Sequence, residues 1–254
     1  MILALDVGNT NIVAGCIDGE DILFIERIKT DTSKTELEYV VLFQALMYLH
    51  KINNDDIEGA IISSVVPPLN NTIIGAVRKM YGIEPKIICP GIKTGLKIKV
   101  DDPATVGSDL IADAVAGLEY YGAPLIMIDM GTATTISVID RDKNFLGGMI
   151  MPGIMVSMDS LVNRTSQLPR IALEPPRKVI GSNTIDCMKS GIILGQASSM
   201  DGMIDRIWNE LGYEVKVVAT GGLASSIVPN CSHDIIIDNE LILKGLKVIY
   251  EKNK

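Results

Sequence analysis

The stretch Ile2-Leu-Ala-Leu-Asp6-Val-Gly8-Asn-Thr-Asn11 has a counterpart in the second half of the chain, Leu125-Ile-Met-Ile-Asp129-Met-Gly131-Thr-Ala-Thr134. The fold is inferred from these two stretches because each repeats the pattern of the other. In both, an apolar run typical of a buried strand ends in an Asp, and a Gly with small polar neighbours follows two residues later. Each stretch continues with an apolar run, a polar turn and a second apolar run. A duplicated pattern of this kind indicates two similar structural halves.

The rest of the chain alternates short apolar runs with segments of helical periodicity. This alternation predicts an α/β architecture, with a meander of strands opening each half. The halves divide near residues 117–124, so we expect an N-terminal domain over 1–117 and a C-terminal domain over 118–254. Helices are expected at about 36–52, 70–81, 111–118, 154–167, 184–211 and 240–250, and later strands at 60–66, 86–89, 215–219 and 234–237.

Composition limits the classes of ligand. Among the 254 residues, aromatic ones make up only 4%, and 31 acidic against 23 basic residues give a net charge of -8. Nucleic-acid binding is therefore not expected, because phosphate-backbone contacts need basic side chains and base stacking needs aromatic ones. A small phosphorylated ligand remains open, since backbone N–H groups can hold phosphate without lysine.

Sequence features also predict the cellular setting. The four cysteines are scattered and only two histidines occur, which predicts no zinc site and a reduced protein. The N-terminus lacks the basic segment of a signal peptide, and no uncharged apolar run reaches about 18 residues. We therefore expect a cytoplasmic protein that makes no membrane contact.

The two Asp-x-Gly loops have the chemistry of phosphate binding. Glycine lets a phosphate approach the backbone closely, and Asn9, Thr10 and Thr132 add short side-chain donors. The Asp at each strand end repels phosphate directly but suits a metal ion or its bound water. Ordinary hairpin turns are the alternative for either loop alone, whereas two matched copies favour a pair of loops that clamp an oligophosphate. No GxxxxGK[ST] or GxGxxG motif is present, which argues against a P-loop or dinucleotide site.

Two further motifs each leave two hypotheses open. Gly221 and Gly222 follow a strand, where bare backbone could lie against a base or ribose, or could simply connect the strand to a helix. Asp109 lies in the first turn of an expected helix. It is either an acid favoured by the helix dipole or a base that accepts the proton of a substrate hydroxyl.

Taken in order, the motifs D-V-G-N-T-N, G-S-D, D-x-G-T-A-T and T-G-G resemble those of the type III pantothenate kinases. The resemblance covers essentially the whole chain, including Gly91 to Leu96 and Gly147 to Gly153. It implies a duplicated actin-like (ribonuclease H-like) core, with two similar mixed-sheet domains around a nucleotide cleft. It also implies ATP-dependent phosphorylation of pantothenate to 4'-phosphopantothenate, the first step of coenzyme A biosynthesis.

The resemblance further implies roles for single residues. Asp109 would be the general base. Asp129 would bind a monovalent cation, potassium or ammonium, and Asp6 would bind the magnesium that accompanies ATP. The protein would be a homodimer, with pantothenate near the subunit interface. ATP would contact Asp6, Val7, Gly8, Asn9, Thr10, Asn11, Ile12, Val13, Thr132, Gly221 and Gly222, and pantothenate would contact Val100, Gly107, Ser108, Asp109, Leu110 and Thr184.

One position departs from the family pattern. The family motif is G-x-D-R, and Leu110 stands where an Arg would pair with the pantothenate carboxylate. Asp113 also replaces a common Asn on the same helix. Arg164 or Arg170 could supply the missing charge, or the substrate could be a related alcohol without a carboxylate. A third hypothesis is a non-catalytic nucleotide-binding paralogue.

Overall fold

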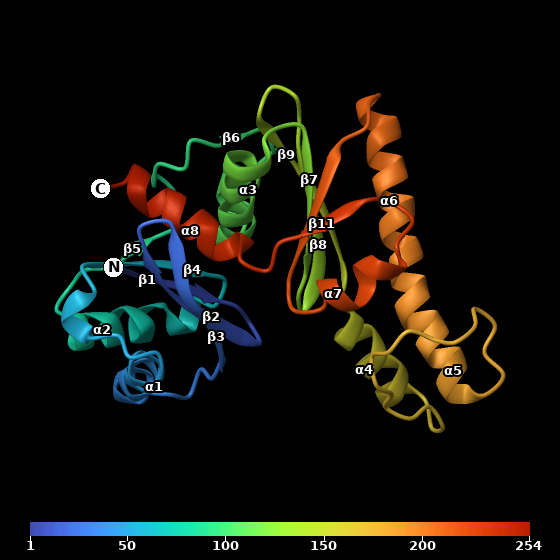
Figure 1. Cartoon of the computed structure of the whole chain (residues 1–254), viewed down its shortest axis with the longest axis horizontal. Helices are drawn as coiled ribbons and strands as arrows, with labels where there is room; N and C mark the ends of the chain where they lie inside the picture. Colours follow the sequence, from blue (N-terminus) through green and yellow to red (C-terminus); the bar gives the residue numbers. More distant parts are fainter. The chain divides into compact units, whose positions relative to one another are not determined.

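Two mixed β-sheets form the frame of the computed structural model, which describes all 254 residues. In the first sheet the strand order is β3-β2-β1-β4-β5 (Figure 1). β1 is antiparallel to β2 and parallel to β4, while β5 runs parallel to β4 at the edge. The strands are β1 (Ile2–Val7), β2 (Asn11–Asp18), β3 (Asp21–Lys29), β4 (Gly59–Ser64) and β5 (Lys86–Ile87).

The second sheet repeats this arrangement and adds one strand. Its order is β11-β10-β7-β8-β9-β6, so β9-β8-β7-β10-β11 matches the first sheet strand for strand. β7 is likewise antiparallel to β8 and parallel to β10. The strands are β6 (Lys97–Ile98), β7 (Leu125–Met130), β8 (Ala133–Ile139), β9 (Asn144–Pro152), β10 (Lys216–Thr220) and β11 (Ile235–Ile237).

The duplication extends to the register of single residues. Asp6 lies opposite Ser63 of β4, and Asp129 lies opposite Thr220 of β10. A register shift also occurs at the same place in both meanders, after Cys16 in the first and after Val138 in the second. The expected duplicated core of two mixed-sheet α/β halves is confirmed.

Helices cover both faces of the first sheet. On one face, α1 (Glu36–Leu49) and α2 (Asn70–Tyr81) pack against alternate strand residues such as Leu3 and Leu5. On the other face, α3 (Ser108–Tyr121) and α8 (Leu241–Lys252) pack against Ala4. The alternation of strand side chains between the faces explains why β1 reads as a continuous apolar run.

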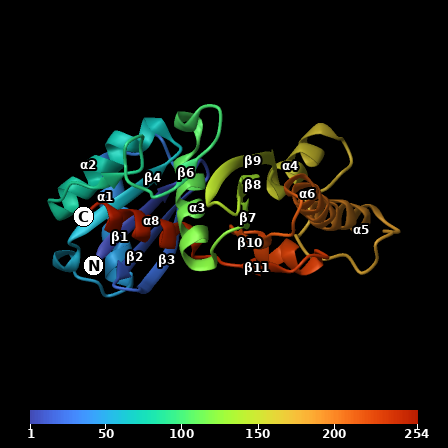
Figure 2. The ribbon, with the colours of Figure 1, turned by 90° about the horizontal axis from the view of Figure 1, so that it is seen from above.

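Four helices pack against one face of the second sheet. They are α4 (Ile154–Arg164), α5 (Thr184–Lys189), α6 (Gly195–Leu211) and α7 (Ala224–Ile227). A π-helical turn, Ser190–Leu194, joins α5 to α6, and the three segments form one continuous rod (Figures 1 and 2). The helix expected over 184–211 is thus present, and it contains one π-helical turn.

The chain divides into two compact units. Unit 1 contains residues 1–96, 101–116 and 240–254, and unit 2 contains 97–100 and 117–239. The sequence analysis places α8 in the second half, but α8 lies in unit 1 because Leu243 and Leu246 pack in the core around Ala4. Similarly, β6 lies in unit 2 because it pairs with β9. The division into domains 1–117 and 118–254 stays a prediction.

None of the helices combines the length and the apolar character that crossing a membrane would require.

Close packing of α8 on α3 generates the first prediction. A Cβ at Gly245 would lie 2.0 Å from the carbonyl oxygen of Ala112, which is backbone and cannot move aside. We expect Gly245→Ala to destabilise the fold by ~1–3 kcal/mol through overpacking. Gly202 of α6 is the matched control, because nothing lies within 4 Å of its missing Cβ.

Gly202→Ala should stabilise the protein by ~0.5–1 kcal/mol, the usual gain for this change inside a helix. Urea unfolding of both variants measures the two effects. A stabilised Gly245→Ala variant would contradict the close packing of these two helices.

Candidate functional site

The first candidate phosphate loop comprises residues 8–11, which lie between the paired residues of β1 and β2 at this end of the sheet. Val7 pairs with Ile12, and the Gly8 N–H donates to the Asn11 carbonyl at 3.0 Å. The side chains of Asn9, Thr10 and Asn11 are exposed, whereas those of Val7 and Ile12 are buried in the core. Of the residues expected to contact ATP, Val7 and Ile12 can therefore offer only backbone atoms.

The second candidate loop is one residue shorter. Met130 pairs with Thr134, which leaves residues 131–133 between the paired positions of β7 and β8. Gly153, just after β9, donates its N–H to the Thr132 carbonyl at 3.2 Å, and Thr30, just after β3, donates to the Thr10 carbonyl at 3.0 Å. These matching bonds show that Thr132 corresponds to Thr10. Asn9 is the extra residue of the first loop, a difference that the repeated sequence pattern does not reveal.

The segment after β3 supports the first loop through hydrogen bonds. The Thr30 hydroxyl donates to the Gly8 carbonyl at 2.6 Å. The next residue, Asp31, is held through its backbone by the fully buried Tyr39 of α1. The Tyr39 hydroxyl accepts from the Asp31 N–H at 3.2 Å and donates to the Asp31 carbonyl at 2.9 Å. A buried side chain thus fixes the strand end that supports the loop.

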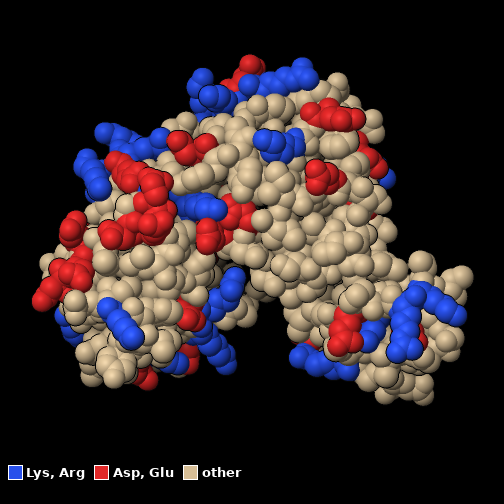
Figure 3. Space-filling model, in the orientation of Figure 1, with Lys and Arg blue, Asp and Glu red and all other residues tan.

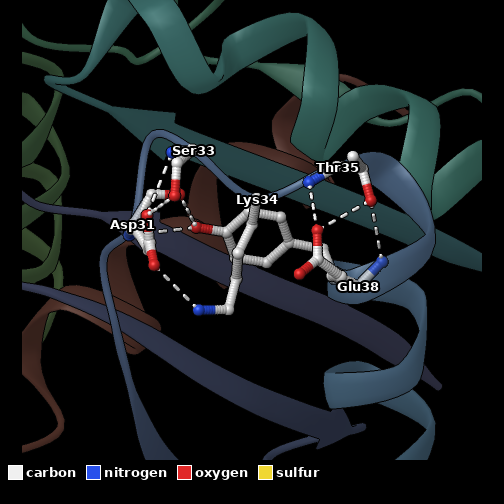
Figure 4. Close-up of polar contacts among 6 residues, drawn as sticks. Asp31, Ser33, Lys34, Thr35 and Glu38 are labelled. Carbon is white, nitrogen blue, oxygen red and sulfur yellow. Dashed lines mark hydrogen bonds and ion pairs between the residues drawn. The ribbon is translucent and has the colours of Figure 1, made fainter.

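The side chains around Asp31 form a surface network (Figure 4). The Asp31 carboxylate accepts from the hydroxyl and the N–H of Ser33 and from Lys34 Nζ, which hold the pKa of Asp31 well below its usual range. Thr35 and Glu38 form a capping box that starts α1, and the Thr35 N–H and hydroxyl lower the pKa of Glu38. Together these bonds fix the path of the chain from β3 into α1.

In unit 1 the structure brings Asp6 and the start of α3 together. The Ser63 hydroxyl donates to Asp6 Oδ1 at 2.8 Å and lies 3.0 Å from Ser108 Oγ. Ser108 is the first residue of α3, is buried, and accepts from the Ser64 N–H at 3.0 Å. Because its hydroxyl is engaged in this interior network, Ser108 can offer a substrate mainly its backbone.

Asp109 follows Ser108 and is half-buried. Its Oδ1 accepts from the Leu110 N–H at 2.8 Å, so the carboxylate contacts the N-terminal turn of α3 as the dipole hypothesis expects. A Cβ at Gly107 would lie 2.3 Å from this oxygen, so a larger residue there would displace the carboxylate from its present position. Since one carboxylate can both cap a helix and accept a proton, both hypotheses for Asp109 remain compatible with the geometry.

In unit 2, the paired glycines have different reasons to be glycine. Gly221 has a φ of +94°, and its Cβ would lie 2.5 Å from Asp129 Oδ1. Nothing lies within 4 Å of the corresponding position at Gly222. Gly221 is therefore required by its packing against the end of β7, and Gly222 is the one that presents open backbone.

Unit 2 also contains a pocket of about 1130 Å³ beside α4, α5 and the π turn. Thr184, expected to contact the substrate, lies on its wall as the first residue of α5. Ser157, Ser160 and Gln196, which no sequence motif indicated, add polar groups to the lining. The first two lie three residues apart on α4, a helical spacing that could have revealed them.

The pocket lining contains no Lys, Arg, Asp or Glu. Arg164 and Arg170 are absent from it, and Arg170 forms an ion pair with Asp159. On the face in Figure 3, basic side chains are interspersed with acidic ones. Of the other residues expected to bind substrate, Val100 lies in unit 2 beside Gly147 and Leu110 is half-buried in the first turn of α3.

Comparison with known proteins gives a consistent match. The family model of type III pantothenate kinases matches residues 2–206. A type III pantothenate kinase from Halalkalibacterium halodurans is 46% identical over 253 residues, which is 100% of each chain.

Two solved structures share the fold. A Campylobacter jejuni protein assigned to the Baf family of transcriptional activators gives a TM-score of 0.63 at 20% identity, over 99% of this chain and 98% of that one. Component A of (R)-2-hydroxyglutaryl-CoA dehydratase from Acidaminococcus fermentans gives 0.57 at 13% identity, over 100% and 99%. At these identities the likeness concerns the fold alone.

The network behind the first loop predicts how stability depends on pH. Because the folded state lowers the pKa of Asp31, its contribution is complete above the unfolded-state pKa of about 3.9 and is lost as the pH falls through the folded value. Asp31→Asn should therefore lower the melting temperature at pH 7, and the difference from the wild type should shrink towards pH 2.

Thermal unfolding between pH 7 and pH 2 measures this effect. Asp55→Asn is the control, because Asp55 is an exposed carboxylate on the same unit. A gap between the wild type and Asp31→Asn that stays constant over this range would contradict the role given to the Asp31 carboxylate.

Proposed function

The chain belongs to the type III pantothenate kinase family, and we propose that it transfers the γ-phosphoryl group of ATP to the primary alcohol of pantothenate. The product would be 4'-phosphopantothenate, the first intermediate towards coenzyme A. One observation in the structure supports the proposal above the others. Asp6 lies near the end of β1, just before the first loop, and Asp109, the candidate base, lies in the first turn of α3. Hydrogen bonds through Ser63 and Ser108 connect the end of β1 with the start of α3.

Phosphoryl transfer needs positioning and charge stabilisation more than covalent help from the protein. In our proposal the backbone N–H groups and short side chains of the first loop bind the ATP phosphates, together with Thr132 of the second loop. Gly222 presents open backbone to the base or ribose, while Gly221 keeps the end of β10 close to Asp129. The nucleotide residues are Asp6, Val7, Gly8, Asn9, Thr10, Asn11, Ile12, Val13, Thr132, Gly221 and Gly222.

Asp109 is the group that we assign to the substrate hydroxyl. The hydroxyl oxygen forms a bond to the γ-phosphorus while the bond between that phosphorus and the β–γ bridging oxygen breaks. ADP leaves with the electron pair of the broken bond, and the hydroxyl proton goes to the Asp109 carboxylate. The half-buried position of Asp109 leaves the carboxylate accessible to a substrate while its backbone remains fixed in α3.

The donor set fits magnesium that arrives with ATP. No group of three or more His, Cys, Asp or Glu side chains could hold a metal ion alone. Magnesium usually takes one or two carboxylates and completes its shell with substrate phosphates and water, so Asp6 suffices as the protein ligand. We assign a monovalent cation, potassium or ammonium, to Asp129, where it would offset the carboxylate charge near phosphate.

For pantothenate we propose contacts with Val100, Gly107, Ser108, Asp109, Leu110 and Thr184. We also propose a homodimer and a cytoplasmic location. A related alcohol without a carboxylate is the second candidate substrate. The reasons to test it are Leu110 in place of an arginine and the uncharged lining of the pocket that contains Thr184.

Turnover of ATP with pantothenate tests the proposal, and the Asp109→Asn variant tests the role of the base. We expect the variant to lose about 10²–10⁴-fold in turnover and to keep its affinity for ATP, because the acid is assigned to the alcohol alone. Asp101→Asn, the same change at a nearby exposed carboxylate, is the control. Wild-type turnover in Asp109→Asn, with chemistry rate-limiting, would refute the assignment.

The same assay tests the cation when potassium is replaced by tetramethylammonium at matched ionic strength. We expect activity to fall, because the bulky ion cannot neutralise Asp129 at close range. Equal rates in the two salts would remove the monovalent cation from the proposal.

Leu110 separates the two candidate substrates. If pantothenate binds without a partner for its carboxylate, Leu110→Arg should lower its KM about 10- to 100-fold by adding a charge-assisted pair. The KM for ATP should change little, and pantetheine, which has no carboxylate, should gain nothing. Leu110→Met, which keeps an apolar side chain of similar size, is the control. An unchanged KM in Leu110→Arg would mean that another residue already pairs with the carboxylate.

A further inference from the structure

A line of buried hydroxyl groups in unit 1 connects Asp6 with the start of α3. Ser63 is 0% exposed and Ser108 is 9% exposed. Neighbouring atoms along the line are 3.0 Å or less apart, from the Ser64 N–H to Ser108 Oγ, then to Ser63 Oγ and on to Asp6 Oδ1. Ser63 comes near the end of β4, directly opposite Asp6 in the parallel register.

The chemistry of the groups fixes the direction of the hydrogen bonds. An ionised carboxylate only accepts, so the single hydroxyl proton of Ser63 points to Asp6 Oδ1. The Ser108 oxygen accepts from the Ser64 N–H, and its single hydroxyl proton can go either to Ser63 Oγ at 3.0 Å or to the Ser64 carbonyl oxygen at 3.1 Å. A bond to an ionised carboxylate is roughly twice as strong as one between neutral groups, which favours this order over others.

We propose that Ser63 is a positioning residue for the reaction: it orients the Asp6 carboxylate for magnesium and ties that orientation to the helix that carries Asp109. This inference rests on the proposed function. With Oδ1 held by Ser63, the plane of the carboxylate is fixed relative to β1. Groups that orient metal-binding side chains in this way commonly change metal affinity or activity by about 10- to 100-fold when removed.

The structure also indicates that losing Ser63 does little damage to the fold. In Ser63→Ala, the Ser108 hydroxyl can turn to the carbonyl oxygen of Ser64, which lies 3.1 Å away. No buried donor is then left without a partner. Ser63→Thr should restore the function, because Thr220 occupies the equivalent register position opposite Asp129 in unit 2.

Titration calorimetry with a non-hydrolysable ATP analogue tests the proposal in the full-length protein. With magnesium, we expect Ser63→Ala to bind the analogue about 10- to 100-fold more weakly than the wild type. In EDTA, the two proteins should bind it equally, because Asp6 then has no metal to hold. Ser63→Thr should bind as the wild type does.

Kinetics and a control variant separate positioning from general structural damage. The KM for pantothenate should stay within about twofold of the wild type, and the melting temperature of Ser63→Ala should fall by no more than about 2–4 °C. Ser137→Ala removes another buried serine hydroxyl, from β8 of unit 2, and should change none of these values.

Equal binding by the wild type and Ser63→Ala in magnesium would overturn the inference and leave the proposed function standing. A deficit of the same size in EDTA, or failure of Ser63→Thr to restore binding, would show a merely structural role. A wild-type protein that binds no nucleotide would overturn both the inference and the proposed function.

Discussion

The hydrogen-bonded register of each central strand is the constraint on which the rest of the molecule depends. β1 is held between antiparallel β2 and parallel β4, and β7 is held in the same way between β8 and β10. A shift by one residue would turn every side chain to the opposite face of the sheet. The register therefore decides that Leu3 and Leu5 enter one core, and that Asp6, the last residue but one of β1, lies beside Ser63 of β4.

The two halves share this frame and differ in the loop that follows each central strand. The first loop has one more residue than the second, and its supports come from Thr30 and the buried Tyr39. Gly153 packs against the second loop so closely that a Cβ added at this position would lie 2.2 Å from the carbonyl oxygen of Thr132. The same strand arrangement thus carries two loops of different length.

Much of the fold could be predicted from the sequence because its signals are local. Apolar runs, the polar turns and the repeated Asp-x-Gly pattern indicate strands, hairpins and duplication without knowledge of any contact. The return of α8 to unit 1 and the edge strand β6 depend on packing between segments far apart in the chain, so no local pattern indicates them. The same holds in the site: Gly107 and Asp109 are recognisable as a motif, whereas the link from Ser63 to Ser108 exists only in the folded chain.

We propose above that the two Asp-x-Gly loops bind the phosphates of ATP. A crystal structure with magnesium and a non-hydrolysable ATP analogue tests it most directly. We predict phosphate oxygens within 3.2 Å of backbone N–H groups of the first loop, magnesium bound to Asp6 or to its water shell, and a contact from Thr132. An analogue bound with its phosphates away from the loop between β1 and β2 would contradict the account.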